Sequence, residues 1–213
     1  MRKKQIRKDS IFLSFPELVF NLDQFFFLDH PYQVIELGTG NGVFLTLLAQ
    51  RYPNRFFWGF DQKKERLWNG CRLAQELNLS NIRFINCKIE DLFPHIPSES
   101  IHEIWVQFPD PFPKPSKANR RLVHHQFFVE YQRILVNGGV FHFKTDSQPL
   151  FKFARETLTD FPLMPFDLEI EDLSDSSTGV DSQWDYMIPT HYEMIWRRQE
   201  RIISYLRAIK GCD

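Results

Sequence analysis

The stretch QVIELGTGNG, residues 33–42, decides the fold of this chain. Residues 33–37 have the apolar pattern of a buried strand, and from Val43 to Arg51 apolar residues recur at helical spacing. The three glycines between them permit a tight turn and a close approach of the backbone to a ligand. A strand, a glycine-rich turn and a helix in this order predict the first unit of an α/β fold, with a ligand at the turn.

Segments typical of strands and helices alternate along the rest of the chain. The expected strands cover residues 55–60, 82–85, 104–108 and 140–144, and the expected helices cover residues 63–78, 124–135 and 148–158. Strands joined through helices form crossover connections, so we predict a three-layer α/β protein: a mostly parallel, twisted sheet with helices on both faces. At the ends, we expect a helical cap over residues 11–28 and a strand over 166–171, while residues 202–209 fit either a strand or the end of a helix.

Composition narrows the class of protein. The hydrophobic fraction of 43% and the aromatic fraction of 15% exclude a disordered chain, and the 22 phenylalanines predict an aromatic interior. No run approaches the ~20 apolar residues that span a bilayer, and polar residues interrupt the apolar stretch after the basic start. We therefore expect no signal peptide, no membrane contact and a cytoplasmic location. Three cysteines without a CxxC spacing indicate neither a disulfide framework nor a zinc site.

The basic residues are clustered, although the net charge is only −1. They crowd three places, namely the start (Arg2, Lys3, Lys4, Arg7, Lys8), the middle (Lys114, Lys117, Arg120, Arg121) and the end (Arg197, Arg198, Arg201, Arg207, Lys210). Clusters of this kind allow a local footprint for nucleic acid on a neutral protein. Ordinary solvated faces explain the same clusters equally well from charge alone.

The glycine turn favours one cofactor. The dinucleotide pattern GxGxxG requires glycine or alanine at position 43, where Val43 stands. A GxGxG turn built on Gly38 and Gly40, with Glu36 just before it, fits S-adenosylmethionine better, since that cofactor has no pyrophosphate to seat. Asp61 ends the second expected strand, where it can accept hydrogen bonds from both ribose hydroxyls. A nicotinamide dehydrogenase and a bare structural turn are the alternatives.

A second motif, FPDPFPK, occupies residues 108–114. Each proline fixes its own φ and disfavours helix in the preceding residue, so we expect a stiff, extended loop at the carboxyl end of a strand. There Asp110 and Phe112 would face one cleft, the ring stacking on a purine and the carboxylate accepting from its N–H groups. The loop also resembles the DPPF or NPPY loop of amino-group methyltransferases, and a purely structural loop is a further alternative.

Taken in order, the motifs resemble the bacterial tRNA (guanine-N7-)-methyltransferase family. They are ELGTGNG (36–42), GFD (59–61), FPDPFPK (108–114), RRLV (120–123), NGG (137–139), TD (145–146) and THYE (190–193). The resemblance implies a Rossmann-like fold of the class I S-adenosylmethionine-dependent methyltransferases. It also implies methylation of N7 of a guanine in the tRNA variable loop, which forms 7-methylguanosine. On this basis we expect a basic arm and helical cap over residues 1–30 and the methyltransferase domain over residues 31–213.

The resemblance also assigns residues. Glu36, Gly38, Gly40, Asp61, Lys88 and Asp110 match cofactor positions, and Asp110 also matches the catalytic acid. Lys114, Asp146, Thr190, His191, Tyr192 and Glu193 match substrate positions. Two residues depart from the pattern: Lys88 stands where the family has an acid, so its contact is expected through the main chain, and Phe112 replaces a tryptophan.

The expected chemistry needs no general base, because guanine N7 carries a lone pair and no proton. Asp110 would stabilise the charge that develops on the base or hold its N1/N2 edge. Lys114, Arg120, Arg121 and residues 1–8 would hold tRNA phosphates. No histidine pair has metal-binding spacing, and no obligate protein partner is indicated. An amino-group methyltransferase and a non-catalytic RNA-binding subunit, which Lys88 would favour, remain alternatives.

Overall fold

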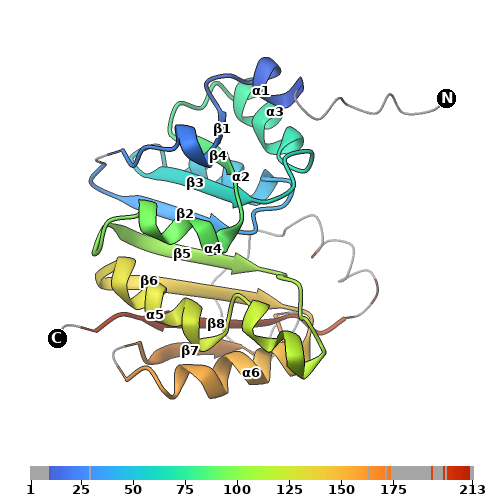
Figure 1. The fold of residues 1–213 in the computed structure, drawn as a ribbon, viewed down its shortest axis with the longest axis vertical. Helices are drawn as coiled ribbons and strands as arrows, with labels where there is room; N and C mark the ends of the chain where they lie inside the picture. The colour runs from blue at the N-terminus through green and yellow to red at the C-terminus, as the bar shows by residue number, and fades with distance from the viewer. Residues whose placement is uncertain are drawn as a thin grey trace. The chain divides into compact units, whose positions relative to one another are not determined.

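The computed structural model describes residues 10–28, 30–162, 164–170, 172–173, 193, 199 and 201–211. The chain divides into two compact units, Met1–His95 and Ile96–Asp213. Both units are built of strands and helices (Figure 1). Within the described ranges, no helix is long and apolar enough to cross a membrane.

The first unit contains four parallel strands in the order β1-β4-β3-β2. The strands are β1 (Val19–Asn21), β2 (Gln33–Leu37), β3 (Phe56–Asp61) and β4 (Ile82–Asn86). The helices are α1 (Ser10–Ser14), α2 (Val43–Arg51), α3 (Trp68–Glu76) and α4 (Ile89–Leu92), with short 3₁₀ turns η1 (Leu22–Gln24) and η2 (Phe93–His95). Every residue of β2 and β3 is buried, as expected for parallel strands that are covered on both faces.

The second unit contains four strands in the order β5-β6-β8-β7. They are β5 (Ile101–Gln107), β6 (Leu135–Thr145), β7 (Phe166–Ile170) and β8 (Ser204–Ile209). β5 and β6 are parallel, whereas β8 runs antiparallel between β6 and β7 (Figure 1). A 3₁₀ helix η3 (Pro115–Arg120) precedes α5 (His125–Ile134) and α6 (Gln148–Leu158), which contact each other and β6.

The strands and helices expected from periodicity are present, with boundaries that shift by a few residues. The segment expected as a helical cap over residues 11–28 differs more. Only Ser10–Ser14 forms an α-helix, and Val19–Asn21 pairs with β4 as a parallel strand. The N–H of Phe84 donates to the carbonyl of Leu18 at 2.7 Å. The backbone groups at the edge of β4 need hydrogen-bond partners, and this segment supplies them by pairing as a strand. At the other end, residues 204–209 form a strand rather than a helix.

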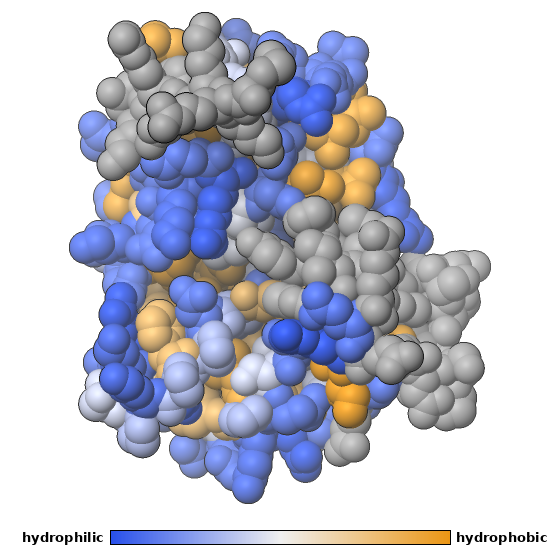
Figure 2. Space-filling model, turned by 90° about the vertical axis from the view of Figure 1, so that its right-hand side faces the viewer, coloured by the Kyte–Doolittle hydropathy of each residue, from blue (hydrophilic) through white to orange (hydrophobic). Residues whose placement is uncertain are grey.

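The interior is aromatic, as the phenylalanine content predicted. The largest fully buried side chains include Trp105, Tyr131 and six phenylalanines: Phe57, Phe60, Phe84, Phe128, Phe141 and Phe143. On the face drawn in Figure 2, hydrophilic residues predominate among the described residues. Many aromatic residues of the strands and helices are thus buried, although Phe26 is 66% exposed.

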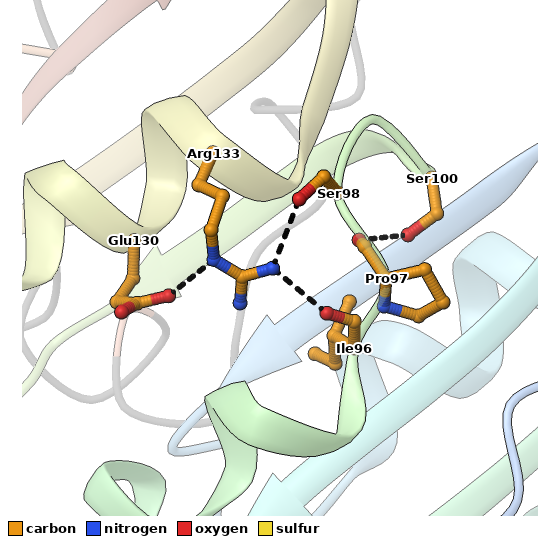
Figure 3. Close-up of polar contacts among 6 residues, drawn as sticks. All are labelled: Ile96, Pro97, Ser98, Ser100, Glu130 and Arg133. Atoms are coloured by element: carbon orange, nitrogen blue, oxygen red, sulfur yellow. Dashed lines mark hydrogen bonds and ion pairs between the residues drawn. The ribbon is translucent and has the colours of Figure 1, made fainter.

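A polar cluster fixes the amino end of β5. Arg133 of α5 donates from Nε to the Glu130 carboxylate at 2.8 Å and from Nη1 to the carbonyl of Ile96 at 3.0 Å (Figure 3). The same Nη1 lies 3.3 Å from the hydroxyl oxygen of Ser98. These contacts hold the approach to β5, whose opposite end leads into the proline loop.

Candidate functional site

The glycine turn lies at the carboxyl end of β2 and leads into α2. Gly38, Gly40 and Gly42 have φ values of 75°, 59° and 69°, in the left-handed region that favours glycine. The N–H groups of Gly38 and Thr39 donate to the carbonyl of Phe60 at 2.8 and 3.0 Å. The turn is therefore tied to β3 and exposes its backbone at the end of the strands.

Gly42 has a second role, in packing. A Cβ on Gly42 would lie 2.6 Å from Cε1 of Phe84 and 3.1 Å from Cα of Gly70. A Cβ on Gly59 would also lie 2.7 Å from the ring of Phe84. The start of α2, the middle of β3 and α3 therefore approach one buried ring, and each needs glycine at the contact. Sequence reasoning missed Gly70, although a glycine inside a helix is unfavourable enough to signal such a contact.

Two predicted carboxylates meet at this turn. Asp61 is 4% exposed, and its Oδ2 accepts from the N–H of Gly40 at 2.9 Å while its Oδ1 accepts from the N–H of Lys63 at 2.7 Å. Burial raises the pKa of Asp61, and the two backbone N–H groups oppose that rise. Glu36 is also buried and accepts from the hydroxyl of Thr39. The structure thus brings Glu36, Gly38, Gly40 and Asp61 together at one end of β2 and β3.

Lys88 is the N-cap residue of α4 and follows β4 closely. The N–H of Cys87 and the side-chain amide of Asn86 both donate to the carbonyl of Asp61, at 3.1 and 2.9 Å. This places the main chain before Lys88 beside Asp61, while the Lys88 side chain is exposed. Among the residues that the structure describes, no group of three or more His, Cys, Asp or Glu could hold a metal ion.

The proline loop of the second unit follows β5 and is less extended than the prolines suggest. Phe108 and Phe112 have φ values of 47° and 40°, in the left-handed region that is rarely occupied by bulky residues. The N–H of Phe108 donates to the carbonyl of Lys144 at 2.8 Å, which ties the start of the loop to β6. Asp110 and Lys114 are exposed. The loop presents both predicted side chains to solvent while storing backbone strain.

The paired arginines lie against this loop in different ways. Arg120 is exposed, and its guanidinium carbon lies 4.9 Å from the centre of the Phe112 ring. Arg121 is half-buried, and its guanidinium donates to the carbonyls of Pro111 and Phe112. Sequence reasoning assigned both to tRNA phosphates and did not predict these contacts with the loop.

The remaining substrate positions are partly described. Asp146 follows β6 and pairs with Arg201 at 2.9 Å. Glu193 is fully buried, and its Oε2 lies 2.8 Å from Nζ of Lys144, which is also fully buried. The signal for this pair is a lysine in the apolar strand FHFKT, because a buried ammonium needs an anionic partner. Thr190, His191, Tyr192 and residues 1–8 lie outside the described residues.

Comparison with known proteins agrees with these features. A family model described as "Putative methyltransferase" matches residues 31–205. The tRNA (guanine-N(7)-)-methyltransferase of Cytophaga hutchinsonii is 36% identical over 86% of this chain and 82% of its own length. The enzyme of the same name from Porphyromonas gingivalis is 33% identical over 85% of this chain and 72% of its own length.

Solved structures show the fold. The 16S rRNA methyltransferase KamB superposes with a TM-score of 0.61 at 13% identity, covering 86% of this chain and 89% of that one. Geranyl diphosphate C-methyltransferase from Streptomyces coelicolor A3(2) was solved with S-adenosyl-L-homocysteine. It superposes with a TM-score of 0.56 at 13% identity, covering 89% of this chain and 76% of that one. The fold is therefore the Rossmann-like α/β fold of class I S-adenosylmethionine-dependent methyltransferases, as the sequence predicted.

Proposed function

This chain belongs to the tRNA (guanine-N7-)-methyltransferase family, and from that membership we propose that it transfers a methyl group from S-adenosylmethionine to N7 of a guanine in the tRNA variable loop. The product is 7-methylguanosine. One observation carries the proposal: the similarity to the Cytophaga hutchinsonii enzyme extends over most of the chain, and so includes both the glycine turn and the proline loop.

The residues of the first unit fit S-adenosylmethionine. Asp61 is held by two backbone N–H groups, and a carboxylate has further lone pairs to accept from ribose hydroxyls. A Cβ on Gly40 would find its nearest neighbour only at 3.9 Å, so this glycine leaves open space beside the backbone. We assign cofactor contacts to Glu36, Gly38, Gly40, Asp61 and the main chain at Lys88. When bound, the cofactor supplies the methyl group from its sulfonium centre.

A binding measurement tests this assignment separately from catalysis. Asp61→Ala should weaken S-adenosylhomocysteine binding by calorimetry at least tenfold, because it removes a ribose acceptor and releases Gly40. Asp91→Ala changes an exposed acid on α4 and is the matched control. Equal affinity of the two variants would remove Asp61 from the cofactor site.

Methyl transfer to N7 depends on alignment more than on proton transfer. The nucleophilic lone pair lies in the plane of the base, so the protein must hold N7, the methyl carbon and the departing sulfur in line. The methylated base gains positive charge. We assign to Asp110 the stabilisation of this charge or the holding of the guanine N1/N2 edge. Asp110→Asn keeps the size of the side chain and removes its charge, so we expect turnover to fall by about 10²-fold, as for other preorganised electrostatic groups.

The tRNA side of the proposal rests on exposed cations and on the segment after residue 189. Lys114 and Arg120 are exposed and are assigned to phosphates, as are residues 1–8. Asp146, Thr190, His191 and Tyr192 are assigned to substrate through the family resemblance. Glu193 is buried against Lys144, so we assign it to anchoring this segment from the inside. Deleting residues 1–8 should weaken tRNA affinity and flatten its salt dependence, and unchanged affinity would remove the arm from the proposal.

Nucleoside mass spectrometry on unmodified tRNA, incubated with the purified protein and S-adenosylmethionine, tests the function itself. We expect 7-methylguanosine, and none with the donor omitted. A nucleoside methylated on an amino group would instead identify the protein as an amino-group methyltransferase. If there is neither product nor cofactor binding, the chain is a non-catalytic RNA-binding protein. The cytoplasmic location predicted from the sequence remains part of this proposal.

A further inference from the structure

Arg121 makes a set of contacts that a phosphate-binding residue does not need. Its Nε lies 3.1 Å from the carbonyl oxygen of Pro111 and 3.3 Å from that of Phe112, and its Nη2 donates to the Phe112 carbonyl at 3.0 Å. Its guanidinium carbon lies 4.5 Å from the centre of the Phe153 ring on α6. We infer that Arg121 is a positioning residue that holds the proline loop in the shape that carries Asp110. The inference rests on the proposed function and deepens it.

The loop depends on support from outside itself. Pro109, Pro111 and Pro113 have no N–H to donate, so few backbone hydrogen bonds can stabilise the loop from within. Phe108 and Phe112 nevertheless hold left-handed backbone angles that are unfavourable for an aromatic residue. A conformation of this kind persists only where neighbouring groups determine it. The bonds from Arg121 end on the carbonyl of Phe112, one of the two strained residues.

The guanidinium is itself held on its other side. Phe153 belongs to α6 and packs against it, and the ring of His124 stacks on Phe153 with centroids 6.2 Å apart at 17°. Burial lowers the pKa of His124, and the nearby charge of Arg121 acts in the same direction. The fork of Arg121 therefore links the loop to a helix that is anchored in the core of the same unit.

The neighbouring arginine provides the contrast. Arg120 is exposed and lies over the ring of Phe112, so its charge faces solvent where a phosphate could approach. Arg121 is half-buried, with its guanidinium engaged by carbonyl oxygens and an aromatic face. A lysine keeps the charge of arginine but lacks the planar fork that bridges two carbonyls. Arg121→Lys therefore separates loop positioning from charge.

Two measurements on the full chain test the inference. Arg121→Lys should lower kcat for tRNA methylation by about 10–100-fold, since small displacements of positioned groups cost that much. Its tRNA Kd and the salt dependence of binding should stay within about twofold of wild type, because the charge is kept. Phe153→Leu, which changes no charge, should lower kcat in the same direction. Lys152→Gln removes an exposed charge from the same helix and is the matched control.

Amide hydrogen exchange gives a readout that does not require activity. Arg121→Lys should speed exchange of the Phe108 amide, which donates to the carbonyl of Lys144 at the start of the loop, in peptides that cover residues 104–117, whereas Lys152→Gln should not. If wild type made no 7-methylguanosine, the proposed function would fail, yet the exchange comparison would still decide whether Arg121 holds the loop. Unchanged exchange in Arg121→Lys overturns the inference, and so does a normal kcat. If Arg121→Gln instead flattened the salt dependence of tRNA binding and left amide exchange in the loop unchanged, Arg121 would be a phosphate-binding residue.

Discussion

Replacing Gly42 by alanine tests whether the glycine turn is shaped by packing as well as by backbone conformation. The new Cβ would lie 2.6 Å from Cε1 of Phe84, which is fully buried in β4. Two other left-handed glycines serve as controls. A Cβ on Gly138 would meet no atom within 4 Å, and one on Gly40 would meet only a carbonyl oxygen at 3.9 Å.

The size of the effect follows from the difference between these sites. All three alanines incur the cost of the left-handed region, about 1–2 kcal/mol, partly offset by about 0.4–1 kcal/mol from a less disordered unfolded chain. Only Gly42→Ala adds overpacking, which costs about 1–3 kcal/mol. Because about 1 kcal/mol shifts Tm by about 2–4 °C in a protein of this size, Gly42→Ala should melt about 2–12 °C below both controls.

Circular dichroism during heating and in urea, on the cofactor-free protein, gives the comparison. Gly40 and Gly42 belong to the same unit, so the comparison between these two variants holds even where the two units unfold separately. If Gly42→Ala melted together with Gly40→Ala and Gly138→Ala, the packing argument would be refuted.

Three further predictions concern buried ionisable groups. Lys144→Met leaves Glu193 buried without its cation, so it should lower the free energy of unfolding in urea by about 3–5 kcal/mol, and adding Glu193→Leu should restore most of that loss. Burial raises the pKa of Asp61 in the folded state, so its contribution to stability is greatest below pH ~4 and is lost as pH rises through the folded pKa. Asp61→Asn should therefore gain stability relative to wild type as pH rises through that window, measured as urea midpoints from pH 4 to 7 without cofactor. Burial raises the pKa of Cys71 and Cys87 to about 12, so neither thiol forms the reactive thiolate at pH 8. In a variant whose third cysteine, Cys212, is replaced by serine, a disulfide reagent at pH 8 should therefore label no thiol until the protein unfolds.

The first unit was largely predictable because independent local signals agree there. Residues 56–61 are a continuous apolar run that ends in an acid, and residues 33–37 are another that ends in glycines. Apolar runs, helical spacing and turn residues all predict the same strand–turn–helix order, and such agreement is typical of segments that local sequence determines. The acids Glu36 and Asp61 were placed correctly at the turn because strand ends are well defined by this pattern.

What sequence reasoning missed depends on partners distant along the chain. Val19–Asn21 is too short to show a period, and it becomes a strand through the open edge of β4. Gly70 looks like a poor helix residue until the ring of Phe84 is seen against it. The ion pair between Glu193 and Lys144 was not predicted, because only the fold reveals that these two side chains lie side by side. In each case the deciding neighbour is at least 14 residues away, where periodicity carries no information.

The glycine turn and the proline loop both contain residues with left-handed backbone angles, but these angles are accommodated in different ways. The glycine turn uses left-handed angles at residues without a Cβ, so its shape is inexpensive and local, and its neighbours are free to pack against it. The proline loop has left-handed angles at Phe108 and Phe112, where they are unfavourable because of the large side chains. A costly local shape must be held by contacts from elsewhere, and the fork of Arg121 supplies them at Phe112. This is why we expect substitution of Arg121, whose guanidinium is engaged by the carbonyls of the loop, to slow methyl transfer.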